Sequence, residues 1–241
     1  MVAALLADAR VVAGQLAAAV APGSPRRAWL QHARDATDAR LAAAARHAAS
    51  DAVPMRPERV CREITAALPA DGIVVTDTGH AAVWAGSWID ITSPSQRFLA
   101  CAGTLGWALP AAIGAKCAYP ERPVICFTGD GGIGYHLAEL ETAARAEINV
   151  VVVVNDNGSY QQVRPGIDAA YGGTQRGFAG EMWRFRPVDY AQVAEEMGCL
   201  GIRVERPESM GPALARAFAA DRPVLIDSVT DVEAFPMPSW G

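Results

Sequence analysis

A glycine-rich segment near the middle of the chain carries the clearest chemical signal. Residues 129–134 read Gly-Asp-Gly-Gly-Ile-Gly, so they fit the GxGxxG pattern of loops that bind dinucleotides. Asp130 argues against that use, because a carboxylate inside a phosphate-binding loop repels the phosphates unless a cation lies between them. Two hypotheses remain: an NAD-binding oxidoreductase, or a site where a divalent cation bridges Asp130 and a phosphorylated ligand.

A second polar segment, Asn155-Asp156-Asn157, follows the next apolar run of the chain. The carboxyl ends of parallel strands lie at one edge of a sheet, so we expect this segment to lie near Asp130. Asn157 offers an amide oxygen there and Ser159 a backbone carbonyl, and oxygen ligands of this kind suit Mg²⁺. A helix that we expect to begin at Gly134 would point its positive end at the anion.

The elements that must position these residues alternate along the chain. Six short apolar or β-branched runs predict strands at 72–76, 97–101, 124–128, 149–155, 199–204 and 224–229. Helical patterns separate most of them, at 57–67, 109–118, 134–146, 189–197 and 209–220. Strands that are apolar on both faces and alternate with helices predict an α/β fold with a six-stranded, mainly parallel sheet and helices on both faces.

Three segments lie outside this alternation. Residues 1–55 predict two alanine-rich helices, at 2–20 and 26–47, which form a short helical segment before a main domain at 56–241. Residues 158–188 are rich in glycine and predict a long functional loop such as a lid. The first side chains of that loop, Tyr160, Gln161, Gln162 and Arg164, either line a substrate cavity or belong to a structural loop. The tail from Phe235 to Trp240 is expected to fold over the site or over a partner.

Composition excludes several classes of protein. The formal net charge is −5 over 241 residues, which argues against a nucleic-acid-binding protein because phosphate contacts need an excess of Lys and Arg. The five cysteines are scattered without a CxxC pair, which is typical of reduced thiols in a cytoplasmic protein rather than of a disulfide framework or a zinc site. No apolar run approaches 18 residues, so we expect no membrane span and no membrane partner.

The order of these motifs resembles the thiamine-diphosphate-dependent enzymes. Gly-Asp-Gly is followed by a helical pattern, a strand pattern and an Asn, with 27 positions between Asp130 and Asn157, which suits that family. The segments at 77–80, 103–115 and 139–143 also resemble family motifs and occur in the family's order. Residues 56–241 are therefore similar to the diphosphate-binding domain of the acetolactate synthase and decarboxylase group.

The resemblance implies a role for each matching residue. Asp130 and Asn157 would bind Mg²⁺ through their side chains and Ser159 through its carbonyl, while the diphosphate would be held by Gly79, His80, Gly131 and Gly132. Leu105 would be the apolar wedge that bends the cofactor, and the backbones of Gly103 and Leu105 would meet the pyrimidine. The chain departs from the family at Asp156, where Asn is common, at Ala81, and at Leu105, where synthases often have Met.

The resemblance also implies a component that this sequence lacks. The family activates its cofactor with a glutamate on a separate pyrimidine-binding domain, and Glu139 and Glu141 lie on the wrong side of the site to serve as one. We expect a partner chain to supply that domain and glutamate in a hetero-oligomer with two sites at dimer-type interfaces. The implied function is the diphosphate-binding subunit of an acetolactate synthase-like carboligase that acts on a 2-keto acid such as pyruvate. The alternatives are a subunit of a 2-keto acid decarboxylase, an NAD-binding oxidoreductase, and a non-catalytic remnant.

Overall fold

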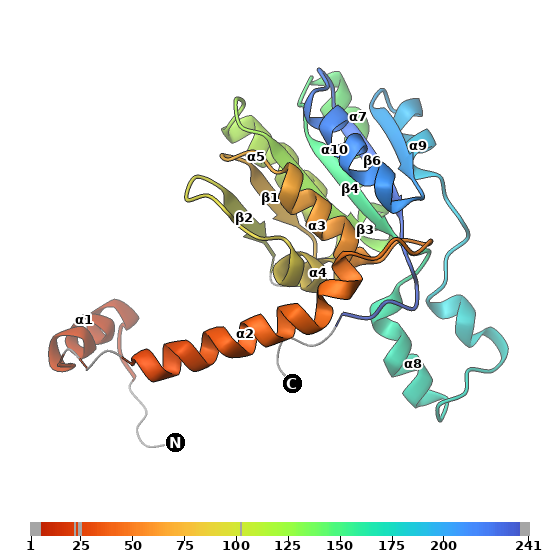
Figure 1. Cartoon of the computed structure of the whole chain (residues 1–241). Coiled ribbons are helices and arrows are strands. Elements are labelled where there is room, and N and C mark those ends of the chain that lie inside the picture. The colour runs from red at the N-terminus through yellow and green to blue at the C-terminus, as the bar shows by residue number, and fades with distance from the viewer. Residues whose placement is uncertain (1–5, 22, 24–25, 102, 237–241) are drawn as a thin grey trace. The chain divides into compact units, whose positions relative to one another are not determined.

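The computed structural model describes residues 6–21, 23, 26–101 and 103–236 (Figure 1). The chain divides into two compact units, with the boundary in the sequence between Ala45 and Arg46. The first unit is helical, as predicted: α1 spans Ala9–Ala19, and α2 begins at Arg27 and ends in the second unit at Ala48. Asp8 caps α1 by accepting a hydrogen bond from the Val11 amide at 3.0 Å, and α1 buries none of its residues. The first residues of the predicted 2–20 helix lie outside the described part of the chain.

The second unit is built on a six-stranded sheet in which every pairing is parallel. The strand order is β2-β1-β3-β4-β6-β5. The strands are β1 (Ile73–Thr76), β2 (Arg97–Ala100), β3 (Val124–Gly129), β4 (Val151–Asp156), β5 (Leu200–Val204) and β6 (Val224–Val229). The predicted α/β class and the six predicted strands are confirmed. The carboxyl ends of β1, β3 and β4 lie side by side, because these strands are neighbours in the sheet.

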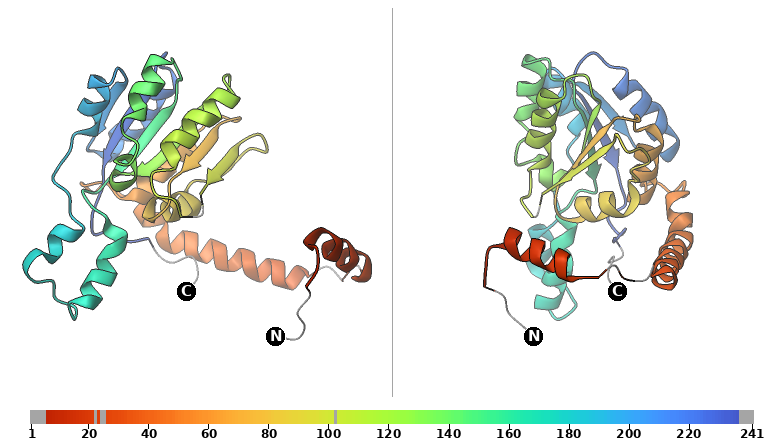
Figure 2. Two further views of the ribbon diagram at one scale, coloured as in Figure 1. Left: turned by 180° about the vertical axis from the view of Figure 1, so that it is seen from behind. Right: turned by 90° about the vertical axis from the view of Figure 1, so that its left-hand side faces the viewer.

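Helices cover both faces of the sheet (Figure 2). One buried cluster joins alternate strand residues such as Val74 and Phe127 to α3 (Pro57–Ala67), α4 (His80–Trp88) and α10 (Met210–Phe218), which follows a short turn η3 (Pro207–Ser209). The other cluster joins the opposite strand face to α5 (Ala108–Ala118), α7 (Glu139–Arg145) and α9 (Tyr190–Glu196). This two-sided burial explains why the central strands are apolar throughout.

The helix predicted at 134–146 is wrong in its first half. A single helical turn, α6 (Asp130–Ile133), begins directly after β3, and α7 begins only at Glu139. Between them the amides of Tyr135 and His136 bond to carbonyls three residues earlier, which is a tighter turn than an α-helix makes. Three glycines within five residues weaken a helix here. The helix end that approaches the site is therefore the turn that contains Asp130, not a helix from Gly134.

The long loop predicted at 158–188 contains short helices of its own. These are η1 (Gln161–Val163), α8 (Arg164–Ala170) and η2 (Gly177–Met182). The segment closes on itself, because the Tyr160 amide donates to the Trp183 carbonyl and the Phe185 amide donates to the Gly158 carbonyl, each at 2.7 Å. None of the helices in the described ranges is both long and apolar enough to cross a bilayer.

Candidate functional site

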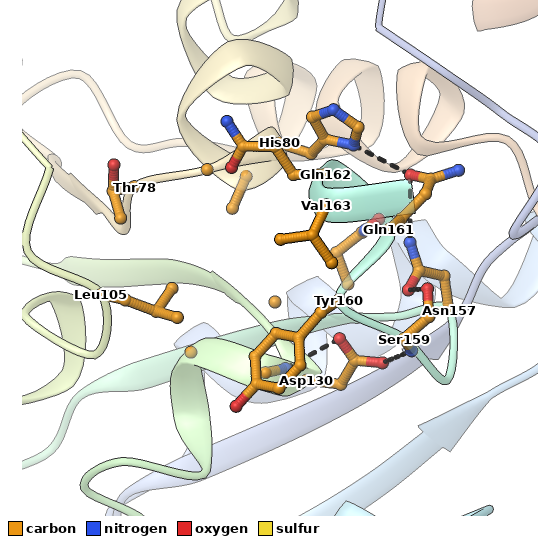
Figure 3. Close-up of a pocket in the computed structure, with 16 residues that line it drawn as sticks. Thr78, His80, Leu105, Asp130, Asn157, Ser159, Tyr160, Gln161, Gln162 and Val163 are labelled. Atoms are coloured by element: carbon orange, nitrogen blue, oxygen red, sulfur yellow. Dashed lines mark hydrogen bonds between the residues drawn. The ribbon is translucent and has the colours of Figure 1, made fainter. Parts of the chain in front are cut away.

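A cavity of about 130 Å³ lies at the carboxyl edge of the sheet, between the segments that follow β1, β3 and β4 (Figure 3). Eight of the nine predicted cofactor residues line it, namely Gly79, His80, Leu105, Asp130, Gly131, Gly132, Asn157 and Ser159. The ninth, Gly103, is exposed and is not among the lining residues, so its contact with a pyrimidine stays a prediction. Tyr160, Gln161 and Gln162 line the cavity, whereas Arg164 does not.

Asp130 is the buried acidic group of this cavity. It is only 4% exposed, and its two carboxylate oxygens accept hydrogen bonds from the Gly131 and Ser159 amides, each at 2.8 Å. Burial, followed by the charge of Asp156, raises the pKa of this carboxyl well above its usual range. A cation beside Asp130 would reverse that effect, because an opposite charge favours the ionised form.

Asp156, the last residue of β4, lies close enough to Asp130 to raise its pKa. Its Oδ1 accepts a hydrogen bond from the Gly158 amide at 3.1 Å, next to the Ser159 amide that bonds Asp130. Asp227, at the neighbouring strand β6, is fully buried, and burial together with Asp156 raises its pKa to about 7 although Arg203 opposes the shift. The structure thus gathers carboxyl groups at this edge of the sheet, and a cation there would favour their charged forms.

The three predicted metal ligands form one connected group. Asn157 Oδ1 accepts from Ser159 Oγ at 2.8 Å, and the Ser159 amide bonds Asp130. Within the described part of the chain, no set of three or more His, Cys, Asp or Glu side chains is arranged to hold a metal ion. A divalent cation here would therefore depend on amide and backbone oxygens in addition to Asp130, as Mg²⁺ sites commonly do.

The glycines of the 129–134 segment are needed for close packing. A Cβ on Gly131 would lie 2.3 Å from the Tyr160 ring, and a Cβ on Gly132 would lie 2.8 Å from Asp77 Oδ2. Asp77 is 1% exposed and accepts from the amides of Thr78 and Gly106, at 2.8 and 2.9 Å. Asp77 begins the segment 77–80 that resembles a family motif, but it is not among the lining residues. Its contacts show that it positions the lining loops instead.

His80 forms the opposite wall of the cavity. It is the first residue of α4 and follows Gly79, whose φ of +74° favours glycine. Burial lowers the pKa of His80, and a hydrogen bond to Gln161 partly offsets this effect. Leu105 lies across the cavity from Tyr160 (Figure 3). No glutamate is among the lining residues of the described chain.

Asn155 is a lining residue that sequence reasoning assigned no role. It is 4% exposed, and its Oδ1 has no hydrogen-bond partner among the described residues. A buried oxygen without a partner costs free energy, which a ligand can recover by supplying a donor or a cation. Together with Asp130, Asn157 and the glycine loop, this oxygen fits a cavity for a divalent cation and a diphosphate.

Comparison with known proteins supports this interpretation. Residues 77–228 match the family model described as the thiamine pyrophosphate enzyme, C-terminal TPP binding domain. A probable acetolactate synthase large subunit from Methanococcus aeolicus is 33% identical over 190 residues, which is 75% of this chain and 31% of that protein. A sulfoacetaldehyde acetyltransferase from Alcaligenes xylosoxydans is 37% identical over 165 residues, or 68% of this chain and 26% of that protein.

A solved structure has the same fold. The thiamine diphosphate-dependent 4-hydroxybenzoylformate decarboxylase of Rhodococcus jostii RHA1 matches with a TM-score of 0.65 and 30% identity, over 74% of this chain and 33% of that one. The chain thus spans about a quarter to a third of the length of these relatives. The family match disfavours the NAD hypothesis, because it covers the GxGxxG segment itself. This chain belongs to the thiamine pyrophosphate enzyme family, of which it carries the C-terminal TPP-binding domain.

Proposed function

We propose that this chain is the diphosphate-binding subunit of a thiamine diphosphate- and Mg²⁺-dependent, acetolactate synthase-like carboligase. Its substrate would be a 2-keto acid such as pyruvate. The observation that carries the proposal is the buried Asp130 carboxylate at the glycine loop, joined through Ser159 to Asn157 at the next strand end. The similarity to an acetolactate synthase over 190 residues supports carboligation. The five cysteines are all unpaired, which supports a reducing compartment such as the cytoplasm.

The residues of this chain would bind and orient the cofactor. Asp130, Asn157 and the Ser159 carbonyl would hold Mg²⁺, and the backbone at Gly79, Gly131 and Gly132, with His80, would hold the diphosphate. Leu105 would press on the middle of the cofactor and exclude water from one side. When bound, thiamine diphosphate supplies a nucleophilic carbon that adds to keto groups, a reaction for which protein side chains alone are poorly suited.

We further propose that a partner chain supplies the pyrimidine domain and the activating glutamate. The cavity of about 130 Å³ is smaller than the roughly 300–1,000 Å³ of pockets that enclose a whole organic ligand. It therefore suits the diphosphate end of the cofactor, with the remainder held elsewhere. The lack of a glutamate among the lining residues of the described chain is consistent with this division.

A 2-keto acid decarboxylase subunit is the second candidate function. A benzoylformate decarboxylase from Pseudomonas aeruginosa is 32% identical over 193 residues, 76% of this chain and 34% of that protein. The matching solved structure is also a decarboxylase. The two functions share the loss of carbon dioxide and differ in the next step, since the remaining fragment either joins a second carbonyl compound or takes a proton.

The test is reconstitution with a chain that contains a pyrimidine-binding domain. We expect no turnover by this chain alone, and release of carbon dioxide from pyruvate once the partner, thiamine diphosphate and Mg²⁺ are present. Formation of acetolactate would identify the carboligase, and acetaldehyde the decarboxylase. Robust turnover by this chain alone would contradict the need for a partner.

A further inference from the structure

Gln161 connects the cavity to a distant part of the chain. It follows Tyr160 at the start of η1, lines the cavity and is only 2% exposed. Its Nε2 donates to the carbonyls of Val232 and Ala234, at 3.1 Å for the latter. Its Oε1 lies 3.0 Å from His80 Nδ1 and 3.3 Å from Asn157 Nδ2. The Gln161 nitrogen and oxygen are therefore both engaged, and Figure 3 shows the two contacts of the oxygen with His80 and Asn157.

This network has one consistent direction. The two backbone carbonyls only accept, so they require the nitrogen end of the Gln161 amide, and its oxygen must face His80 and Asn157. That oxygen in turn requires donors, so His80 carries its hydrogen on Nδ1 and Asn157 presents its NH₂ group. The orientation of Asn157 is thus set by Gln161.

This orientation also fixes where the amide oxygen of Asn157 points. Its oxygen faces Ser159, whose Oγ donates to it at 2.8 Å and whose own amide bonds Asp130. An Asn turned the other way would direct an NH₂ group at the predicted metal site, and that group cannot ligate a cation. Gln161 therefore keeps the ligand oxygen of Asn157 on the side of Asp130.

The other partners of Gln161 belong to the C-terminal segment, residues 231–236. This segment is held at its start by the Asp231 amide, which donates to the Met55 carbonyl at 2.8 Å. Arg164, just after η1, pairs with Glu233 at 2.7 Å. The Phe235 ring packs edge-on against His80 with centroids 5.5 Å apart. The segment thus docks on Gln161 and His80, which line the cavity, and on Arg164 beside them, whereas residues 237–240 of the predicted tail lie outside the described part of the chain.

We infer that Gln161 is a positioning residue that couples docking of the C-terminal segment to binding of the metal and cofactor, an inference that rests on the proposed function. Because the same amide holds the segment and orients Asn157, each event stabilises the other. Linkage makes the coupling reciprocal: metal and cofactor should tighten the segment, and a loosened segment should weaken the metal.

The experiment compares Gln161→Met with Gln96→Met in the full chain. Gln96 is a matched control, since it is 3% exposed and its Nε2 also donates to two carbonyls, at 2.9 and 3.4 Å, but it does not line the cavity. Binding of Mn²⁺ in place of Mg²⁺, with thiamine diphosphate present, is followed by electron paramagnetic resonance. Loss of an interaction that orients a metal ligand costs roughly 10–100-fold in metal affinity, so we expect a loss of this size for Gln161→Met and none for Gln96→Met.

Hydrogen exchange of the amides at 233–235 provides the second readout. We expect Mn²⁺ with thiamine diphosphate to slow this exchange in the wild type and in Gln96→Met, but not in Gln161→Met. Gln161→Glu keeps an oxygen that can accept from His80 and Asn157 but loses the donor to both carbonyls, so metal and cofactor should not slow exchange at 233–235 in this variant either. This second variant tests the inference if Gln161→Met fails to fold. If the Gln161 variants bind Mn²⁺ as tightly as the wild type and show the same slowing of exchange, the inference is overturned but the proposed function is not. A wild type that binds no Mn²⁺ with thiamine diphosphate would overturn the proposed function as well.

Discussion

Three aspartates lie at three neighbouring strands of the sheet. Asp156 belongs to β4, Asp227 belongs to β6, and Asp130 directly follows β3. Burial raises the pKa of Asp130 and of Asp227, and the charge of Asp156 adds to both shifts. Arg203 pairs with Asp227, but Asp227 Oδ1 has no partner among the described residues. At the scale of single residues, these carboxyl groups therefore destabilise the fold when they are charged, and a cation bound beside them would offset that cost.

The pH dependence of stability follows from these shifts. A carboxyl whose pKa is higher in the folded than in the unfolded chain contributes to stability below its unfolded pKa, which is about 4. That contribution is lost as the pH rises through the folded pKa, which is about 7 for Asp227. Asp156→Asn removes a charge that raises both values. We expect its free energy of unfolding to fall less than that of the wild type between about pH 5 and about pH 8.

Urea unfolding without divalent cations measures this difference. His80 contributes in the opposite direction, because its pKa is lowered, so only the comparison between the two proteins is informative. Asp221→Asn is the control, since the side chain of Asp221 is 95% exposed. An Asp156→Asn variant with the same pH dependence as the wild type would show that Asp156 does not act on the buried carboxyls.

At the scale of elements, the site depends on how closely α6 approaches the end of β1. Gly132 lies against Asp77, and Asp77 bonds Thr128 Oγ1 at 3.0 Å and the Gly106 amide at 2.9 Å. One buried carboxylate thus joins the segment after β1 to the end of β3 and to the loop before α5. A side chain at position 132 would separate these elements.

Gly132→Ala and Gly134→Ala make a matched pair for this claim. A Cβ at 132 would lie 2.6 Å from Thr128 Oγ1, so we expect a loss of about 1–3 kcal/mol in the free energy of unfolding. A Cβ at 134 meets nothing closer than 3.7 Å in a helical conformation, so that change should be neutral or stabilise by up to about 1 kcal/mol. Chemical denaturation measures both, and equal effects would contradict the close approach.

The strands were predictable because buried β-branched runs such as those at 124–128 and 149–155 are bounded by polar or glycine-rich turns. Helix α4 was missed because its apolar residues are spread around the helix rather than gathered on one side, so His80–Trp88 shows no helical periodicity. The site residues near Asp130 could be predicted from spacing, since parallel strand ends share one edge. The contacts of Gln161 could not, because its partners His80 and Ala234 are 81 and 73 positions away and only the tertiary fold brings them together.

At the scale of the whole molecule, this chain corresponds to one domain of relatives that are much longer. It spans about a quarter to a third of its relatives, and its cavity of about 130 Å³ suits one end of a cofactor. Under the proposed function, the chain contributes the cation and diphosphate half of a site that a partner completes. Catalysis then requires assembly with the partner chain, whereas binding of the metal and diphosphate requires Asp130 of this chain.

The most direct test is the thermal unfolding of the full chain with thiamine diphosphate, with and without Mg²⁺. A ligand at 100 times its Kd stabilises the folded state by about 2.7 kcal/mol, which is a measurable rise in Tm. We predict that thiamine diphosphate raises the Tm of the wild type and of the exposed control Asp221→Ala only when Mg²⁺ is present. Asp130→Ala should show no rise under either condition. An equal rise without Mg²⁺, or an undiminished rise in Asp130→Ala, would contradict the proposed role of Asp130 and the metal.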